Sequence, residues 1–133
     1  MDTKRLQSIP LFAGLSKNEL QELGRLSDEV DLPAGKHLVE QGEFSYEFFV
    51  IESGTADVTQ EGQHIATLGP GDFFGEIGLV RSSRRTASVV ATSPMSLIVM
   101  GRREFSAMAD VIPHVADAIR RKLEERLGTD HEA

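Results

Sequence analysis

The sequence of 133 residues is long enough for one domain with a single core, and 40% of its residues are hydrophobic. It contains no cysteine, which excludes disulfides, thiolate metal sites and thiol catalysis. With 14 basic and 21 acidic residues, its net charge of −7 argues against a general nucleic-acid-binding surface.

Residues 1–28 are predicted to form an N-terminal helical segment. Ser16-Lys17-Asn18-Glu19 has the pattern of a capping box, in which a serine and a glutamate three residues later satisfy free backbone N–H groups at a helix start. An apolar stripe with helical spacing follows, at Leu20, Leu23 and Leu26. We expect residues 9–12 to form a short turn or helix that packs on this stripe.

Residues 29–101 are predicted to form strands. Short segments with strand character alternate with turns rich in glycine, proline and aspartate, and this spacing indicates an antiparallel sandwich or roll. The expected strands are 29–32, 38–40, 47–51, 56–59, 64–68, 87–91 and 97–100. The fold class is therefore mainly β with flanking helices.

Residues 102–128 are predicted to form two C-terminal helices. The first covers 102–109, and Pro113 breaks it or starts the second. Apolar residues then recur every fourth position, at Val115, Ile119, Leu123 and Leu127, and Gly128 is a plausible C-cap. This spacing suits packing on the roll, closure over a ligand or pairing with another chain, and does not decide among them.

The apolar runs are far shorter than a membrane span, and the N-terminus lacks the apolar region of a signal peptide. No segment for a helix-turn-helix follows the last helix. We expect a cytoplasmic protein with no membrane partner and no direct nucleic-acid partner.

Residues 71–91 combine features of an anion site. Gly71 to Glu76 are predicted to form a turn that leads into a short helix, whose first N–H groups attract phosphate. Gly75 would let a ligand approach the backbone closely, and Glu76 is an acceptor suited to hydroxyl groups. Nine positions later, Arg85 offers a planar fork for phosphate oxygens. A sugar phosphate would satisfy both side chains.

The stretch 74–89 resembles the phosphate-binding cassette of cyclic nucleotide-binding domains. It reads Phe-Gly-Glu-Ile-Gly-Leu, then a short loop at 80–83, then Arg-Arg-Thr-Ala-Ser-Val, without a gap relative to that pattern. The resemblance extends over nearly the whole chain. It implies the β-roll (a double-stranded β-helix, or jelly roll) of catabolite activator proteins and protein kinase A regulatory subunits, as one domain over 1–133.

The resemblance also implies roles for single residues. Glu76, helped by the Gly75 backbone, would bind the ribose 2′-hydroxyl group, and Arg85 would pair with the cyclic phosphate. Backbone N–H groups around Ile77, Gly78, Thr86 and Ala87 would complete the phosphate site. The base would lie against apolar strand residues, under the last helix.

Two positions depart from the family pattern. Arg84 stands where many members have proline, and we expect Arg84 and Arg81 to be solvated. Thr86 stands where cAMP-selective domains usually have alanine, and the Arg-Thr-Ala sequence resembles that of cGMP kinases and nucleotide-gated channels. We favour cAMP because of the breadth of the family, and cGMP remains open.

We expect a sensor domain without catalytic activity, metal or cofactor. Binding would move the last helix about a hinge at 106–113, and an effector protein or fused domain would read that movement. A homodimer is possible.

Two alternatives remain. The roll could be an interaction module that has lost nucleotide binding. It could also be a cupin-type metal enzyme, but the histidines (His37, His64, His114 and His131) are scattered and form no His-x-His pair.

Overall fold

A computed structural model describes residues 3–42, 47–75 and 87–129, apart from the side chains of Leu123, Glu124 and residues 126–129. The helices are α1 (Thr3–Gln7), the 3-10 helix η1 (Pro10–Phe12), α2 (Lys17–Leu26), α4 (Arg102–Val111) and α5 (Pro113–Thr129). The strands are β1 (Asp28–Leu32), β2 (His37–Val39), β3 (Glu47–Ser53), β4 (Ala56–Gln60), β5 (Gln63–Leu68), β6 (Phe73–Phe74), β7 (Ser88–Ala91) and β8 (Met95–Gly101).

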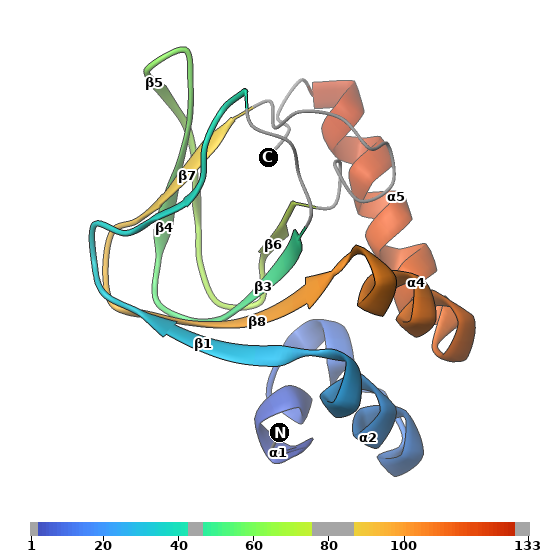
Figure 1. The fold of residues 1–133 in the computed structure, drawn as a ribbon. Helices are drawn as coiled ribbons and strands as arrows, with labels where there is room; N and C mark the ends of the chain where they lie inside the picture. Colours follow the sequence, from blue (N-terminus) through green and yellow to red (C-terminus); the bar gives the residue numbers. More distant parts are fainter. Residues whose placement is uncertain (1–2, 43–46, 76–86, 130–133) are drawn as a thin grey trace.

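The strands form two antiparallel four-stranded sheets, in the orders β1-β8-β3-β6 and β2-β7-β4-β5. The two sheets close over each other as a roll, with α1 and α2 under β1 and β8 and with α4 and α5 beside the end of β8 (Figure 1). The expected fold class, mainly β with flanking helices, is confirmed.

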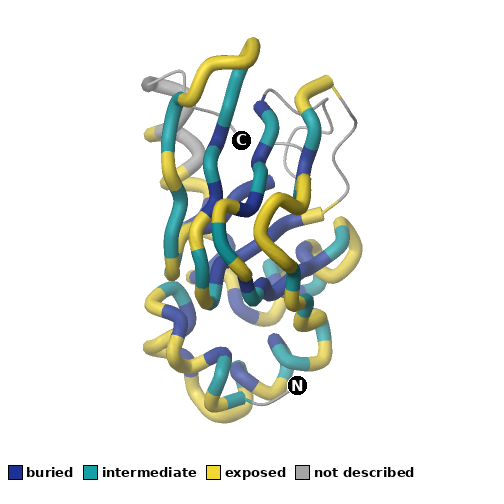
Figure 2. The backbone as a smooth tube through the Cα atoms, turned by 90° about the vertical axis from the view of Figure 1, so that its left-hand side faces the viewer, coloured by how far each residue is buried: buried dark blue, intermediate teal, exposed yellow. Residues whose placement is uncertain are grey.

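The sheet β1-β8-β3-β6 is covered on both faces, which explains the continuous apolar run in β3. Phe48 and Val50 face the helices, whereas Phe49 and Ile51 face the inside of the roll. Apolar residues of α1, η1, α2, α4 and α5 all join Phe48 in one cluster, so both ends of the chain share a core. β3 and β8 are largely buried, whereas β1 and β5 contain only half-buried and exposed residues (Figure 2).

The capping box at the start of α2 is confirmed. The Ser16 N–H donates to Glu19 Oε1 at 2.9 Å, and the Glu19 N–H donates to Ser16 Oγ at 3.2 Å. The short helix expected before it is η1.

Two expectations about local structure need correction. Phe73 and Phe74, expected in a turn that leads into a helix, form strand β6, because they pair with Val50 and Phe49 of β3. The helix itself would lie outside the described residues. Gly128 is not a C-cap, since α5 continues to Thr129. The stretch 106–113, predicted to act as a hinge, is helical apart from Ile112, which separates α4 from α5, and the hinge itself stays a prediction.

The capping box predicts a pH dependence of stability. The hydrogen bond from the Ser16 N–H holds the pKa of Glu19 below its ordinary value, and His114 of α5, 3.9 Å away, acts in the same direction when protonated. A lowered pKa in the folded state means that the carboxylate stabilises the fold above the ordinary glutamate pKa of about 4.3. This contribution is lost as the pH falls through the lowered pKa.

Glu19→Gln keeps the capping hydrogen bond and removes the charge. The urea midpoint of this variant should therefore fall less than that of the wild type between about pH 5 and pH 2. Urea unfolding of both proteins at each pH measures this difference, and parallel profiles would contradict the role of the charge.

Candidate functional site

The seven predicted site residues fall in two groups. Gly75 and Ala87 are described by the structure, and both are buried. Glu76, Ile77, Gly78, Arg85 and Thr86 lie outside the described residues, as do Arg81 and Arg84, so their roles stay predictions. The structure thus defines the two ends of the predicted cassette.

The first end is anchored on β3. Phe73 and Phe74 pair with β3, and the turn before them is tied to the same strand: the Gly71 N–H donates to the Ile51 carbonyl, and the Ile51 N–H to the Asp72 carbonyl, both at 2.8 Å. Gly75 then has φ of +91°, a conformation that favours glycine over residues with a side chain. The chain therefore enters the cassette from a fixed position.

The second end is anchored in the other sheet. Ala87 is fully buried, and β7, which follows it, is hydrogen-bonded between β2 and β4. β6 is an edge strand of one sheet and β7 an inner strand of the other, so residues 76–86 connect the two sheets.

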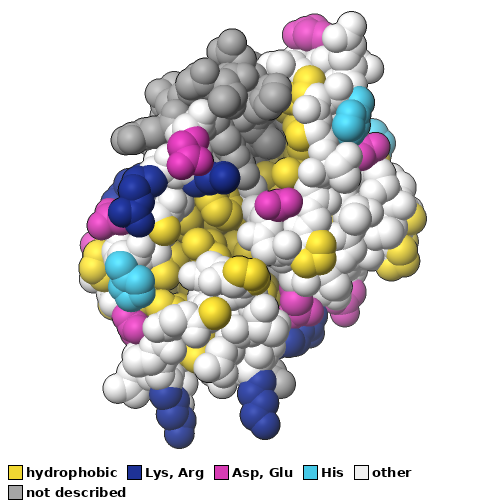
Figure 3. Space-filling view, turned by 180° about the vertical axis from the view of Figure 1, so that it is seen from behind, with side chains coloured by type: hydrophobic (Ala, Val, Ile, Leu, Met, Phe, Trp, Pro, Cys, Tyr) yellow, Lys and Arg dark blue, Asp and Glu magenta, His cyan; other side chains and the backbone are white. Residues whose placement is uncertain are grey.

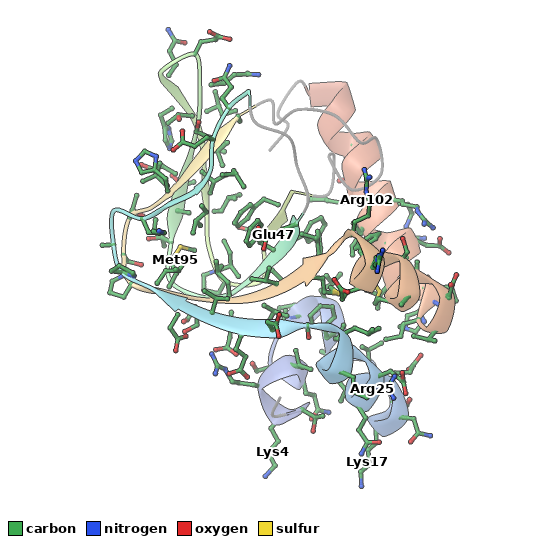
Figure 4. The ribbon with its side chains drawn as sticks, in the orientation of Figure 1. Lys4, Lys17, Arg25, Glu47, Met95 and Arg102 are labelled. Atoms are coloured by element: carbon green, nitrogen blue, oxygen red, sulfur yellow. The ribbon has the colours of Figure 1, made fainter. Side chains whose placement is uncertain are left out.

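Both ends contact the apolar interior of the roll. Phe74 and Ala87 belong to the same buried cluster, and the Phe74 ring stacks on Phe49 with centroids 4.8 Å apart. Met95, at the start of β8, is buried in this cluster (Figure 4). Partly exposed apolar residues border the cluster, namely Val30, Leu32, Leu38, Ile65, Ala66 and Leu68. Half-buried apolar side chains of this kind suit contact with the flat apolar face of a nucleobase.

A hollow on the back of the molecule also gathers apolar side chains, with Lys, Arg, Asp and Glu side chains at its rim (Figure 3). Among the labelled cations, Lys4, Lys17 and Arg25 point away from the roll at the helical end (Figure 4).

Arg5 is committed to a structural network. It donates from Nε to Glu52 of β3 at 2.6 Å, pairs with Glu29 and lies 3.7 Å from Asp31, both in β1. The hydrogen bond to Glu52 is the main cause of a raised pKa for Arg5. Because its guanidinium is held by carboxylates, it is not available to a phosphate.

In the described part of the chain, no three His, Asp or Glu side chains gather in a group that could hold a metal. His37 pairs with Glu40, His64 with Asp57 and His114 with Glu19, in three separate places. His131 lies outside the described residues. Over the same part of the chain, no helix combines the length and apolar character needed to span a bilayer.

Comparisons with known proteins agree with this geometry. A family model described as cyclic nucleotide-binding domain matches residues 29–111. The chain is 29% identical over 128 residues to the cAMP-dependent protein kinase regulatory subunit of Schizosaccharomyces pombe, covering 96% of this chain and 30% of that protein. It is 32% identical over 110 residues to a cGMP-dependent protein kinase of Caenorhabditis briggsae, covering 77% of this chain and 15% of the kinase.

A solved structure of similar fold is the catabolite activator protein of Thermus thermophilus. It has 30% sequence identity and a TM-score of 0.81, covering 91% of this chain and 59% of that one. The chain spans less than a third of the length of each of the two curated relatives, the regulatory subunit and the cGMP-dependent kinase.

Proposed function

Because this chain belongs to the cyclic nucleotide-binding domain family, a family of regulatory modules, we propose that it binds cAMP or cGMP in the roll and signals through its last helix. The observation that carries the proposal is the cassette sequence at 74–89, together with the anchoring of its ends. One end lies on each sheet, and both contact the buried interior of the roll.

Two side chains give the proposed site its chemistry. Arg85 supplies two parallel N–H donors for the cyclic phosphate, and Glu76 accepts from the ribose 2′-hydroxyl group. Backbone N–H groups of Ile77, Gly78, Thr86 and Ala87 satisfy the remaining phosphate oxygens, which a buried ion pair requires. The base packs on the apolar residues at the border of the roll cluster.

The proposed output is a movement of α5. Val115 and Ile119 hold α5 in the core that Phe48 shares, and Ile112 is the break about which α5 can turn. A nucleotide shifts α5 only by as much as it binds the closed arrangement better than the open one. An effector protein or a fused domain would read the new position of α5, and neither catalysis nor a cofactor is part of the proposal.

The two nucleotides would interact differently with Thr86. The threonine hydroxyl group can donate to or accept from a guanine edge, whereas adenine selectivity in the family accompanies alanine. The relatives include kinases named for each nucleotide. We favour cAMP and keep cGMP as the alternative.

Calorimetric titration with cAMP and cGMP tests the proposal and the choice of base. We expect saturable binding of at least one nucleotide by the wild type. If Thr86 contacts guanine, Thr86→Ala should weaken cGMP binding by about tenfold, which is the effect of losing one hydrogen bond. The Kd for cAMP should then change by less than about twofold.

Equal changes for both nucleotides would assign the hydroxyl group to the phosphate or the backbone. No heat from either nucleotide at millimolar concentration would overturn the proposed function and favour the interaction module without a ligand. Tight stoichiometric binding of a divalent metal would instead revive the cupin alternative.

A further inference from the structure

A group of hydrogen bonds ties two turns and the start of β7 together at one end of the sheet β2-β7-β4-β5. The backbone N–H of Gln41, after β2, donates to Ser88 Oγ at the start of β7, at 2.8 Å. The Gln41 side chain makes a pair of bonds with Glu61 in the β4–β5 turn: its Oε1 accepts from the Glu61 N–H and its Nε2 donates to Glu61 Oε1, both at 2.9 Å. We call Gln41, Glu61 and Ser88 the clasp.

The clasp holds a backbone conformation that its residue type disfavours. Gln60 and Gln63 are paired, so Glu61 and Gly62 form a two-residue hairpin loop, with φ of 53° and 77°. Loops with two positive φ angles prefer asparagine, aspartate or glycine at the first position. Glu61 is the only non-glycine residue with positive φ in the described part of the chain. Its fit to the Gln41 amide explains a glutamate at this position.

The clasp lies beside the second end of the cassette. Ser88 follows the fully buried Ala87 directly and pairs with Thr59 of β4. Gln41 therefore connects the start of β7 to the tip of the β4–β5 hairpin. The position of Ala87 therefore depends on where the turn at Gln41 and the tip of the β4–β5 hairpin are held.

We propose that Gln41 is a positioning residue for the nucleotide site. Through Ser88 it fixes the position of Ala87, whose backbone N–H is one of the phosphate donors in the proposed function. The inference rests on the proposed function, and extends it to a residue that contacts no nucleotide. Since hydrogen bonds to a charged phosphate depend steeply on distance and angle, a small shift of Ala87 weakens binding.

The opposite end of the same strand provides a matched control. Ser93 Oγ accepts from the Thr55 N–H at 3.0 Å, just as Ser88 Oγ accepts from the Gln41 N–H. Thr55 Oγ1 also bonds to Thr92 Oγ1 at 2.7 Å. Ser88 is the first residue of β7 and Ser93 lies two residues beyond its last, and each accepts from a neighbouring turn, but only Ser88 belongs to the cassette.

The experiment compares nucleotide Kd values, using whichever of cAMP and cGMP the wild type binds more tightly. Ser88→Ala, which removes the acceptor of the Gln41 N–H, should raise Kd by roughly tenfold, as expected when a charge-assisted bond is lengthened. Gln41→Ala keeps that N–H and loses only the two bonds to Glu61, so it should raise Kd by severalfold. Ser93→Ala should leave Kd within twofold, although all three variants lower the unfolding midpoint by a few degrees. Hydrogen exchange over residues 87–90 without nucleotide should be faster in Gln41→Ala and Ser88→Ala alone.

An exchange of donor and acceptor keeps the test independent of folding losses. Gln41→Glu places two carboxylates opposite each other and should raise Kd. The double variant Gln41→Glu, Glu61→Gln restores the bond between the two side chains with donor and acceptor exchanged, while the backbone N–H of residue 61 still donates to the side chain of residue 41. This variant should return Kd to within threefold of the wild type.

The inference is overturned if Gln41→Ala binds like the wild type, if Ser93→Ala weakens binding equally, or if the double variant stays as weak as Gln41→Glu. A wild type that binds neither nucleotide overturns the proposed function, and this inference with it. A wild type that binds normally while Gln41→Ala does so too overturns the inference only.

Discussion

Arg85→Ala should weaken nucleotide binding at least about 100-fold, which corresponds to about 2.7 kcal/mol. Truncating one member of a buried, hydrogen-bonded charge pair typically costs about 2–5 kcal/mol, much of it because the other charge is left buried without a partner. The cyclic phosphate would be that charge. Titration calorimetry of the wild type and the variant, at one salt concentration, measures the loss.

The neighbouring arginines are the controls. Arg81→Ala and Arg84→Ala remove the same formal charge, and we expect each to change Kd by less than about threefold, because exposed charges act through screened attraction. Arg85→Lys keeps the charge without the planar fork and should fall between the wild type and Arg85→Ala. An Arg85→Ala variant that binds normally would contradict the site assignment, while leaving nucleotide binding itself intact.

The fold was predictable where local pattern and tertiary packing agree. The strands of the roll carry β-branched and aromatic residues between glycine-containing turns, and seven of the eight were expected near their observed positions. The Ser16 and Glu19 pair defined the start of α2, because a capping box depends only on residues within one turn.

Local pattern failed where distant residues decide the structure. β6 consists of Phe73 and Phe74 only, and these are a strand because β3 lies beside them. Gly54 is required for a reason that only the fold reveals: a Cβ there would lie 2.3 Å from the Pro94 carbonyl oxygen, on a loop far along the chain. The pairing of Gln41 with Glu61 likewise joins two turns that no sequence pattern relates.

For the candidate site, unlike for β6, residue types and spacing in the sequence carry most of the prediction. The residue types and spacing of Glu76 and Arg85 indicated a sugar phosphate before any fold was known, since few ligands need a hydroxyl acceptor beside a phosphate fork. The structure adds the positions of two residues: Gly75 directly follows β6 of one sheet, and Ala87 directly precedes β7 of the other. The role of the clasp could be inferred only from these positions.

Phe48→Ala should lower the free energy of unfolding by about 3–5 kcal/mol, the range for removing a buried phenylalanine. Phe48 is fully buried, and its ring lies 5.6 Å from that of Phe73 in β6 and 5.3 Å from that of Phe105 in α4. A domain of this length has a stability of roughly 7–20 kcal/mol, so the loss is a large share. Urea unfolding of the apo protein gives the value, and a loss under about 1 kcal/mol would contradict the packing described.

Phe49→Ala is the matched control, since the adjacent side chain is equally large and faces the opposite side of β3. We expect a similar loss of stability but a different local effect. Phe48→Ala removes packing from α4 and should speed hydrogen exchange there, whereas Phe49→Ala removes the ring on which Phe74 stacks. If the cassette binds the nucleotide, Phe49→Ala should weaken binding more than Phe48→Ala at equal stability, because Phe49 stacks on Phe74, the residue directly before Gly75, whereas Phe48 contacts Phe73, one position farther from the site. Equal effects of the two variants on Kd would mean that the site responds to overall stability and not to the anchoring of β6.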